Sequence, residues 1–276
     1  KELLNKGIYY KREVSPRNPK GRELKYFIPL INSAIEYDAI PFGIDPYTVG
    51  LVLGDGSYYP KGQNLSITTH INDIEELKSY IPYDKTSTVV DKRRTSTVRF
   101  GLVGVGSLWG TLVGEYKNDK KEIPEKLLYG TKQDRIEVLR GLMDSDGTIT
   151  DKGNYTFSST SEKLAYGVHH IVKSLGGYST VKKYENNYKG YYYVSFNLLD
   201  INPFKLKRKA DRWIKDNHYK SGVRVGIESI EPINEVVESK CISVDSDTKS
   251  DLIENSIVTH NTTLVAEYMI LYQAVF

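Results

Sequence analysis

Pro46–Ser57, PYTVGLVLGDGS, and Ile136–Thr148, IEVLRGLMDSDGT, follow one plan in two places of the chain. Each stretch has a glycine, then an apolar pair, then a small residue, then Asp-Gly. The two stretches align residue by residue, as Gly50 with Gly141, Gly54 with Ser145, Asp55 with Asp146 and Gly56 with Gly147. The aspartates stand at positions 55 and 146, so the sequence predicts an internal repeat of about 90 residues.

Start and stop signals predict that each stretch is a helix. Asp45-Pro46 provides an N-cap followed by proline at the first helical position. Thr131 with Asp134 resembles a capping box in which Asp replaces the usual Glu or Gln. The glycine after each aspartate suits the left-handed residue that ends a helix, so we expect that conformation at Gly56 and Gly147.

Small residues recur four positions apart in both predicted helices, at Gly50 and Gly54 and at Gly141 and Ser145. Residues at this spacing share one face of a helix, so the two helices can approach closely side by side. Both helices then end at the same level. We expect the aspartates that follow them to emerge next to each other.

The segments after the two motifs also repeat. Residues 58–81 and 150–177 each read as a hairpin, a Ser/Thr-rich cap and an amphipathic helix. Residues 87–102 and 178–197 are strand-like and rich in β-branched and basic residues. The predicted unit is therefore helix, hairpin, helix, hairpin, helix, which makes the chain an α+β protein with two such units.

The charge distribution and the amino-acid composition limit the kinds of binding partner and site that the chain can have. The formal charge is only +3, but residues 1–26 carry eight Lys/Arg against three Glu, and residues 205–224 carry eight against two Asp. Such clusters suit a phosphate backbone, although most charged clusters are solvated faces. Cys241 is the only cysteine, which excludes a disulfide framework and a cysteine zinc site. No apolar run approaches a membrane span, and the sequence predicts an intracellular protein.

Two neighbouring carboxylates predict a metal site. Like charges in contact repel each other unless a cation or a proton separates them. Mg²⁺ takes one or two carboxylates and fills its other positions with water and phosphate oxygens. Metal ions held in this way activate water and stabilise the leaving oxygen of a phosphodiester displacement. Asp55 and Asp146 are the predicted ligands of Mg²⁺ or Mn²⁺.

TVGLVLGDG and LRGLMDSDG resemble the paired motifs of LAGLIDADG homing endonucleases, and KKEIPEKLLYG before the second motif resembles the intein-borne type. The resemblance implies a monomer with pseudo-twofold symmetry, in which two αββαββα repeats present their sheets to the DNA major groove. It also implies metal binding by Asp55 and Asp146. Family members often place a lysine near the active site on a strand of each half, so Lys92 and Lys182 or Lys183 are candidates, with phosphate contact or mere solvation as open alternatives. The strands would read the DNA through Arg93, Arg94, Arg99, Lys183, Tyr188 and Tyr192.

DLIENSIVTHNT at 251–262 resembles the C-terminal splicing blocks of an intein. The resemblance implies that the side-chain amide of Asn261 attacks its own backbone carbonyl and breaks the chain. His260 would assist by hydrogen bonding and proton transfer. Thr262 would receive the upstream segment on its hydroxyl. Cys241 stands where many inteins have an aspartate, so it either aids the branch chemistry or packs in the core.

Residues 262–276, TTLVAEYMILYQAVF, resemble the helix after a Walker A loop in a phage terminase large subunit. The N-terminal splicing half is absent from this sequence, so it comes in trans from a split gene or the sequence is truncated. The expected organisation has five parts, namely a basic linker at 1–40, the first repeat at 41–130, the second at 131–222, the C-terminal splicing segment at 223–261 and host protein at 262–276.

Three function classes follow. The first is a site-specific DNA endonuclease with part of a splicing element, in a phage-encoded intracellular protein. The second is a nucleic-acid-binding scaffold or maturase on the same fold. The third is a splicing element with a vestigial endonuclease. The presence of both Asp55 and Asp146 favours the first class.

Overall fold

The structure is a computed structural model that describes residues 7–16, 18–31, 33–91, 94–115, 120–150, 154–185, 190–213, 224–229, 250–253 and 257–260. The chain divides into two compact units. Residues 33–218 form the central unit, and residues 1–32 with 219–276 form the flanking unit.

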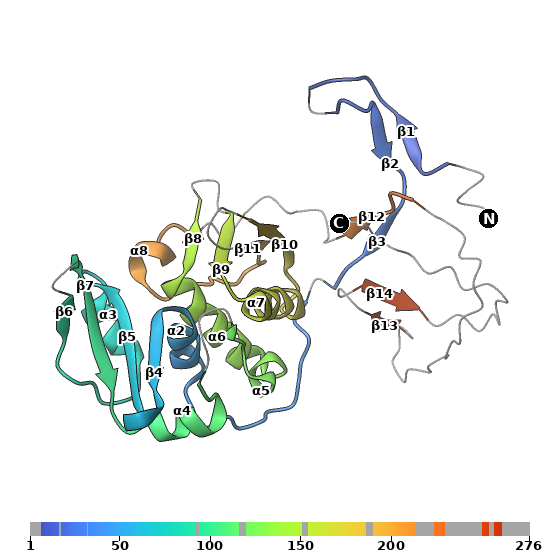
Figure 1. Cartoon of the computed structure of the whole chain (residues 1–276). Helices are drawn as coiled ribbons and strands as arrows, with labels where there is room; N and C mark the ends of the chain where they lie inside the picture. Colours follow the sequence, from blue (N-terminus) through green and yellow to red (C-terminus); the bar gives the residue numbers. More distant parts are fainter. Residues whose placement is uncertain are drawn as a thin grey trace. The chain divides into compact units, whose positions relative to one another are not determined.

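The central unit consists of two repeats with the same order of elements (Figure 1). The first contains α2 (Pro46–Asp55), β4 (Gly56–Tyr59), β5 (Asn64–His70), α3 (Ile74–Tyr80), β6 (Val89–Asp91), β7 (Arg94–Leu102) and α4 (Gly106–Leu112). The second contains α6 (Lys132–Ser145), β8 (Gly147–Ile149), β9 (Tyr155–Ser159), α7 (Glu162–Ser174), β10 (Tyr178–Tyr184), β11 (Tyr191–Asn197) and α8 (Lys207–Ala210). The short helices η1 (Pro60–Gly62) and α5 (Glu125–Leu128) supplement this plan. The antiparallel sheets have the orders β4-β5-β7-β6 and β8-β9-β11-β10, so the predicted unit is confirmed in both repeats.

Both motif helices begin as their caps predict. Asp45 accepts a hydrogen bond from the Thr48 amide at 2.8 Å, and Pro46 opens α2. Thr131 and Asp134 make both bonds of the capping box at the start of α6. These caps satisfy amides that the first helical turn leaves without an intrahelical partner.

The glycines that end these helices do not adopt the left-handed conformation, so that prediction was wrong. Gly56 has φ −91° and ψ 163°, which is extended backbone, and Gly147 is not among the glycines with positive φ. Space is the reason for glycine here. A Cβ on Gly56 would lie 2.4 Å from the Val52 Cα, and a Cβ on Gly147 would lie 2.6 Å from the Met143 Cα.

Helices α2 and α6 pack in direct backbone contact, side by side between the two sheets (Figure 1). A Cβ on Gly50 would lie 2.2 Å from the carbonyl oxygen of Val138, three residues before Gly141. A Cβ on Gly141 would lie 2.2 Å from the carbonyl oxygen of Tyr47, three residues before Gly50. Because the two contacts are equivalent and reciprocal, the two helices are related by a local pseudo-twofold axis.

Each sheet buries one face against the helices and leaves the other open. Alternation places Ile67 and Phe100 of the first sheet, and Phe157 and Val194 of the second, in the core with at most 1% of each exposed. We call the opposite side of each sheet its open face. Residues on the same side of a sheet as these core positions therefore point toward the helices and not toward the open face.

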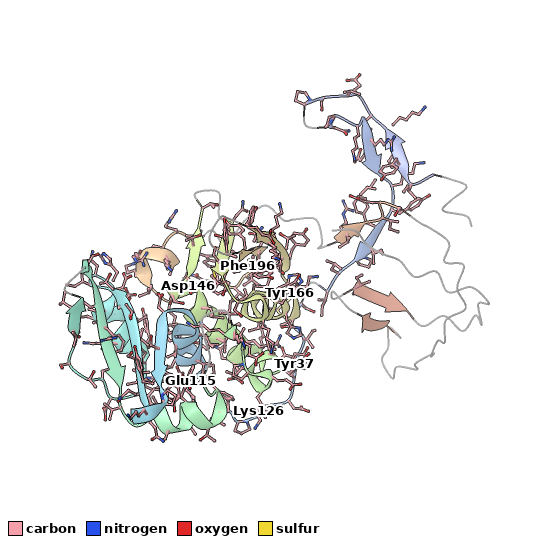
Figure 2. All side chains as sticks on the ribbon, viewed as in Figure 1. Tyr37, Glu115, Lys126, Asp146, Tyr166 and Phe196 are labelled. Atoms are coloured by element: carbon pink, nitrogen blue, oxygen red, sulfur yellow. The ribbon has the colours of Figure 1, made fainter. Side chains whose placement is uncertain are left out.

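Arg135 is fully buried in the central unit, where its guanidinium is bonded to backbone carbonyl oxygens and to the Ser174 hydroxyl. Its guanidinium donates to the carbonyl oxygens of Gly130 at 3.0 Å and Ser174 at 2.9 Å, and also to that of Ile35. The ring of Tyr37, labelled in Figure 2, lies 4.8 Å from the guanidinium carbon. Arg135 thus fastens the segment that precedes α2 onto α6 and α7.

Arg135→Met is expected to destabilise the protein by about 2–4 kcal/mol, because it leaves several buried carbonyls without donors. The measurement is denaturant unfolding monitored by circular dichroism. Arg140→Met is the control, since the Arg140 side chain is 26% exposed and its Glu137 pair borders solvent. We expect a loss of about 1 kcal/mol there. Equal losses at both positions would contradict the role assigned to Arg135.

The flanking unit joins segments from the two ends of the chain. β1 (Tyr9–Lys11) pairs with β2 (Arg22–Leu24), and β13 (Ser250–Ile253) pairs with β14 (Ile257–His260). β3 (Phe27–Pro29) pairs with β12 (Arg224–Gly226), and Leu30 bridges to Ile257. The central unit is therefore an insertion between two paired parts of the flanking unit. Among the described helices, none has the length and apolar character needed to cross a bilayer.

Candidate metal centre and nucleic-acid interface

Asp55 and Asp146 lie where each motif helix passes into the first strand of its sheet. Asp55 is the last residue of α2, and Asp146 is the C-cap of α6, labelled in Figure 2. The two helix ends are adjacent, since a Cβ on Gly54 would lie 3.2 Å from Oδ2 of Asp146. Both aspartates are exposed at the surface. The close helix contact therefore delivers two accessible carboxylates to one place.

The electrostatics of these carboxylates disfavour ionisation without a cation. Burial raises the pKa of Asp146 to about 6, and the neighbouring Asp55 carboxylate adds to the rise. Burial also raises the pKa of Asp55, against the opposing effects of Lys121 and Lys209. Both side chains also reach solvent, so a cation can approach them. A bound cation would relieve the repulsion.

Lys121 reaches the end of the first motif helix from the segment before α5. Its ammonium donates to the carbonyl oxygen of Gly54 at 2.7 Å, and the residue is only 7% exposed. Burial lowers its pKa, and the charges of Asp146 and Asp55 oppose that shift. Lys121 thus caps α2 and lies within electrostatic reach of both aspartates.

Lys209 of α8 occupies the corresponding place at the end of the second motif helix. Its ammonium donates to the carbonyl oxygens of Met143 at 2.7 Å, Asp144 at 2.8 Å and Gly147 at 2.8 Å. Burial lowers its pKa to about 8. These three carbonyl acceptors lie before and after Asp146 in the sequence, and they hold the charge of Lys209 near enough to lower the pKa of that aspartate.

Sequence reasoning missed these two lysines. It considered Lys92 and Lys182 or Lys183, of which Lys92 lies outside the described residues and the other two are exposed residues of β10. Lys182 is not among the groups that shift the pKa of either aspartate. A usable signal existed, because Lys121 and Lys209 both stand in Lys-rich segments that follow the last strand of a repeat.

Asp144, the other acid of the second motif, has a structural role. Its Oδ2 accepts from the Tyr47 hydroxyl at 2.8 Å and from the amides of Lys205 and Leu206 at 3.0 and 3.1 Å. Asp144 is 4% exposed, and burial raises its pKa. It therefore ties the first motif helix to the segment before α8, while Asp146 two residues later faces solvent.

The open faces carry polar, aromatic and basic side chains. On the first sheet Arg99 is exposed and pairs in register with Thr68 of β5. On the second sheet Lys182 pairs with Tyr193, and the rings of Tyr184 and Tyr191 stack with centroids 5.5 Å apart. The remaining described residues of these two faces include Ser57, Tyr59, Ser66, Thr97, Thr148, Thr180 and Ser195.

Lys183 and Tyr192 lie on the other side of the second sheet. They pair with each other in register and share the face of Val194, which is fully buried beneath the helices. Lys183 forms an ion pair with Glu185 at 3.0 Å, and the raised pKa of Tyr192 reflects burial and the charge of Glu162 at the start of α7. The structure does not bring these two residues to the open face.

Several predicted site residues fall outside the described part of the chain, namely Lys92, Arg93, Tyr188, Cys241, Asn261 and Thr262. Arg94 is the first residue of β7, and His260 is the last residue of β14, opposite Ser250. Within the described residues, no group of three or more His, Cys, Asp or Glu side chains is arranged to hold a metal ion.

Comparison with known proteins identifies one domain. Residues 134–207, most of the second repeat, match the family described as "LAGLIDADG-like domain". The chain is 30% identical over 238 residues to the replicative DNA helicase DnaB of Mycobacterium intracellulare, which covers 83% of this chain and 37% of the helicase. It is 27% identical over 188 residues to the ATP-dependent DNA helicase Hel308 of Thermococcus kodakarensis, covering 64% of this chain and 16% of Hel308. The chain thus spans less than two fifths of each of these relatives.

Solved structures of the homing endonuclease I-DmoI are also similar. One, in complex with DNA and Ca, is 15% identical and has a TM-score of 0.43, covering 62% of this chain and 96% of that chain. Another, a set of mesophilic variants, is 17% identical with a TM-score of 0.41, covering 57% and 89%. Further structures of the same endonuclease contain Mn or Mg.

Proposed function

Because the chain contains a LAGLIDADG-like domain, we propose that its central unit is a site-specific DNA endonuclease that cuts both strands in a metal-dependent reaction. The observation that carries this proposal is the pair of adjacent, exposed carboxylates at the ends of two helices in backbone contact. Like charges are brought together at a cost in electrostatic energy, and a divalent cation removes that cost.

Asp55 and Asp146 fit Mg²⁺ or Mn²⁺ in number and in chemistry. Both are carboxylates, and these hard cations are usually held by one or two carboxylates together with water and substrate phosphates. When bound, the ion supplies positive charge that activates water and stabilises the oxygen leaving from phosphorus. The aspartates themselves orient the site, because each is fixed at the end of a rigid helix.

Lys121 and Lys209 supply the remaining positive charge. Their ammonium groups are anchored to the last carbonyls of α2 and α6, beside both aspartates. Anchored cations at this place stabilise negative charge that develops on a phosphodiester during cleavage. One lysine for each helix end matches one reaction for each strand of the duplex.

The open faces of the two sheets are the proposed DNA-binding surface. Arg99 and Lys182 offer cations to phosphates, and the hydroxyls of the Ser, Thr and Tyr residues around them offer donors and acceptors to base edges. Lys183 and Tyr192 belong to the helix-facing side and are left out of this surface.

The direct test is cleavage of a duplex that spans the uninterrupted terminase ATPase gene, in Mg²⁺, with strand-resolved product analysis. Site-specific cutting of both strands is the expected result. Salt-sensitive binding to this duplex without cutting would instead favour the nucleic-acid-binding scaffold or maturase as the function.

Metal binding should depend on pH through Asp146. The folded-state pKa of Asp146, about 6, lies above the usual value of about 4, so ionisation of this carboxyl group is disfavoured in the folded protein. The free energy of unfolding therefore falls as pH rises from about 4 to about 6. Mg²⁺ offsets this cost only where Asp146 is ionised. At tenfold excess over its dissociation constant, Mg²⁺ is expected to raise Tm by about 3–6 °C at pH 7.5 and far less at pH 5.

Thermal scans with and without Mg²⁺ at both pH values measure this effect. Asp146→Asn is the matched control, and it should remove the Mg²⁺-induced shift at pH 7.5. An equal shift at pH 5 and pH 7.5 would rule out Asp146 as the titrating ligand.

We further propose that the flanking unit is the C-terminal part of an intein. Two observations support this. The central unit is inserted between paired strands of the flanking unit, and the relatives that this chain matches over a minor share of their length are two DNA helicases and a replication factor C small subunit. An element inserted into unrelated hosts produces such matches. Asn261 would then cyclise with help from His260, Thr262 would be the acceptor of the upstream segment, and Cys241 would aid the branch chemistry or pack in the core, next to a terminase-like host segment.

A further inference from the structure

Two short segments connect the repeats in a reciprocal way. Strap 1, residues 120–123, follows the first repeat, and strap 2, residues 204–209, follows the last strand of the second repeat. We call α3 and α7, which follow the first hairpin of each repeat, the sheet helices. Each strap contacts the sheet helix of the other repeat, and it places a lysine at the end of the motif helix of its own repeat, α2 for strap 1 and α6 for strap 2. Strap 1 carries Lys121, and strap 2 carries Lys209.

Strap 2 is held on α3 of the first repeat by a bidentate ion pair. Nε and Nη2 of Arg208 donate to Oδ1 and Oδ2 of Asp73, each at 2.7 Å. The Asp73 side chain is 5% exposed, whereas that of Arg208 is 55% exposed. The amide of Lys207 also donates to Oε1 of Glu76 at 2.7 Å. A planar guanidinium bonded at two oxygens fixes orientation as well as distance.

Asp73 is the N-cap residue of α3, yet its side chain makes no capping bond to that helix. Asp at this position normally accepts from an amide of the first helical turn. Here the carboxylate is bonded to Arg208 instead. The contact with strap 2 therefore replaces the local role of the residue.

Strap 1 is held on α7 of the second repeat by the corresponding residue. Ser161 is the N-cap of α7, and its hydroxyl accepts from the Leu164 amide at 3.2 Å while donating to the carbonyl oxygen of Lys121. An exposed ion pair between Glu122 and Lys163 lies beside it. The N-cap of each sheet helix thus holds the lysine-bearing strap of the opposite repeat.

We propose that Asp73 and Arg208 are positioning residues for Lys209, and that Ser161 is the positioning residue for Lys121. This inference rests on the proposed endonuclease function. It adds that contacts between the two repeats position the lysines that act in cleavage. Because the duplex is bound by two repeats related by a pseudo-twofold, each lysine serves one strand. Loosening one strap should then slow the cutting of one strand selectively.

Lysine labelling tests the positioning without any cleavage. The folded protein is treated briefly with acetic anhydride, and labelling of Lys209 and Lys121 is read from tryptic peptides by mass spectrometry. Asp73→Asn and Arg208→Gln are expected to raise labelling of Lys209 by about tenfold and leave Lys121 unchanged. Ser161→Ala is expected to do the reverse.

Strand-resolved cutting tests the consequence. Asp73→Asn removes the ion pair but keeps a side chain that can cap α3, and it leaves Arg208 access to water, so the protein is expected to fold. One strand should be cut roughly 10- to 100-fold more slowly, the cost expected for a misplaced reacting group. Ser161→Ala should slow the other strand, and Arg208→Lys should restore part of the rate lost in Arg208→Gln.

Glu122→Gln is the matched control, because it breaks an ion pair on strap 1 that is exposed to solvent, and it should alter neither lysine. Unchanged Lys209 labelling in Asp73→Asn, or equal slowing of both strands, would overturn the proposal. If the wild-type protein cuts no duplex but Lys209 labelling responds as expected, the endonuclease function fails while the positioning of Lys209 stands.

Discussion

Asp146→Asn is expected to reduce double-strand cleavage by about 10³-fold or more. The reason is that it removes one of two carboxylates proposed to hold the metal ion, and such ions supply several kcal/mol of transition-state stabilisation. Asp55→Asn should have a similar effect. The measurement is the single-turnover rate of cleavage of each strand in Mg²⁺, with the protein in excess over the duplex and at a concentration above the dissociation constant of the complex.

The same substitution should increase the stability of the folded protein above pH 6. Wild-type Asp146 has a raised pKa of about 6, so its ionised form is disfavoured by burial and by Asp55. An amide carries no charge and escapes this cost. Below pH 4, where Asp146 is protonated in both states, the difference in Tm between variant and wild type should vanish.

Loss of activity together with loss of stability at pH 7.5 would point to a structural role instead. Asp144→Asn provides a comparison within the same motif. Asp144 is buried and bonded to three donors, so its substitution is expected to act on the docking of strap 2 and not on metal binding. Mg²⁺ should still raise the Tm of Asp144→Asn at pH 7.5.

Gly50→Ala and Gly141→Ala should each prevent stable folding of the central unit. The new methyl group would lie 2.2 Å from a backbone oxygen of the opposite helix, and neither helix can move without separating the other contacts between them. We expect a loss of at least about 3 kcal/mol, which is a large part of the stability of an ordinary domain. Denaturant unfolding and the soluble yield measure it.

Gly167→Ala is the control for this experiment, because it makes the same change within a helix. The atoms nearest to a Cβ on Gly167 belong to the side chain of Ile123, the closest at 3.1 Å, and that side chain can shift. Alanine also favours the helix by about 1 kcal/mol over glycine. We expect little change or a small gain. Comparable losses at Gly50 and Gly167 would show that helix contact is not what requires glycine at Gly50.

Local signals in the sequence predicted the parts of the fold that depend on neighbouring residues. The caps at Asp45 and Thr131 form within four residues, and their hydrogen bonds are those predicted. The repeated order of helices and hairpins is confirmed for the same reason, since periodicity and turn residues act over short segments. The exception is the glycine after each aspartate. A left-handed turn was predicted there, and the actual constraint is contact with the preceding helical turn.

Strand faces were harder to predict because they alternate with every residue. Lys182 and Lys183 are neighbours in the sequence, yet one belongs to the open face and the other to the helix-facing side. A shift of one residue in register exchanges the two faces, so the choice depends on how β10 pairs with β11. Composition alone, rich in Lys and Tyr here, does not reveal which of these side chains can reach DNA.

The two motif helices, the small residues on their shared face and the two aspartates that follow them could be predicted from the sequence. The lysines that accompany those aspartates could not, because their positions depend on tertiary packing. Lys121 lies 67 residues from Gly54, and Lys209 lies 62 residues from Gly147, so these bonds depend on straps that cross between the repeats. The difference comes from the separation of the interacting residues along the chain. Caps and helices are specified by residues a few positions apart, whereas a site made by two repeats exists only after the repeats have packed.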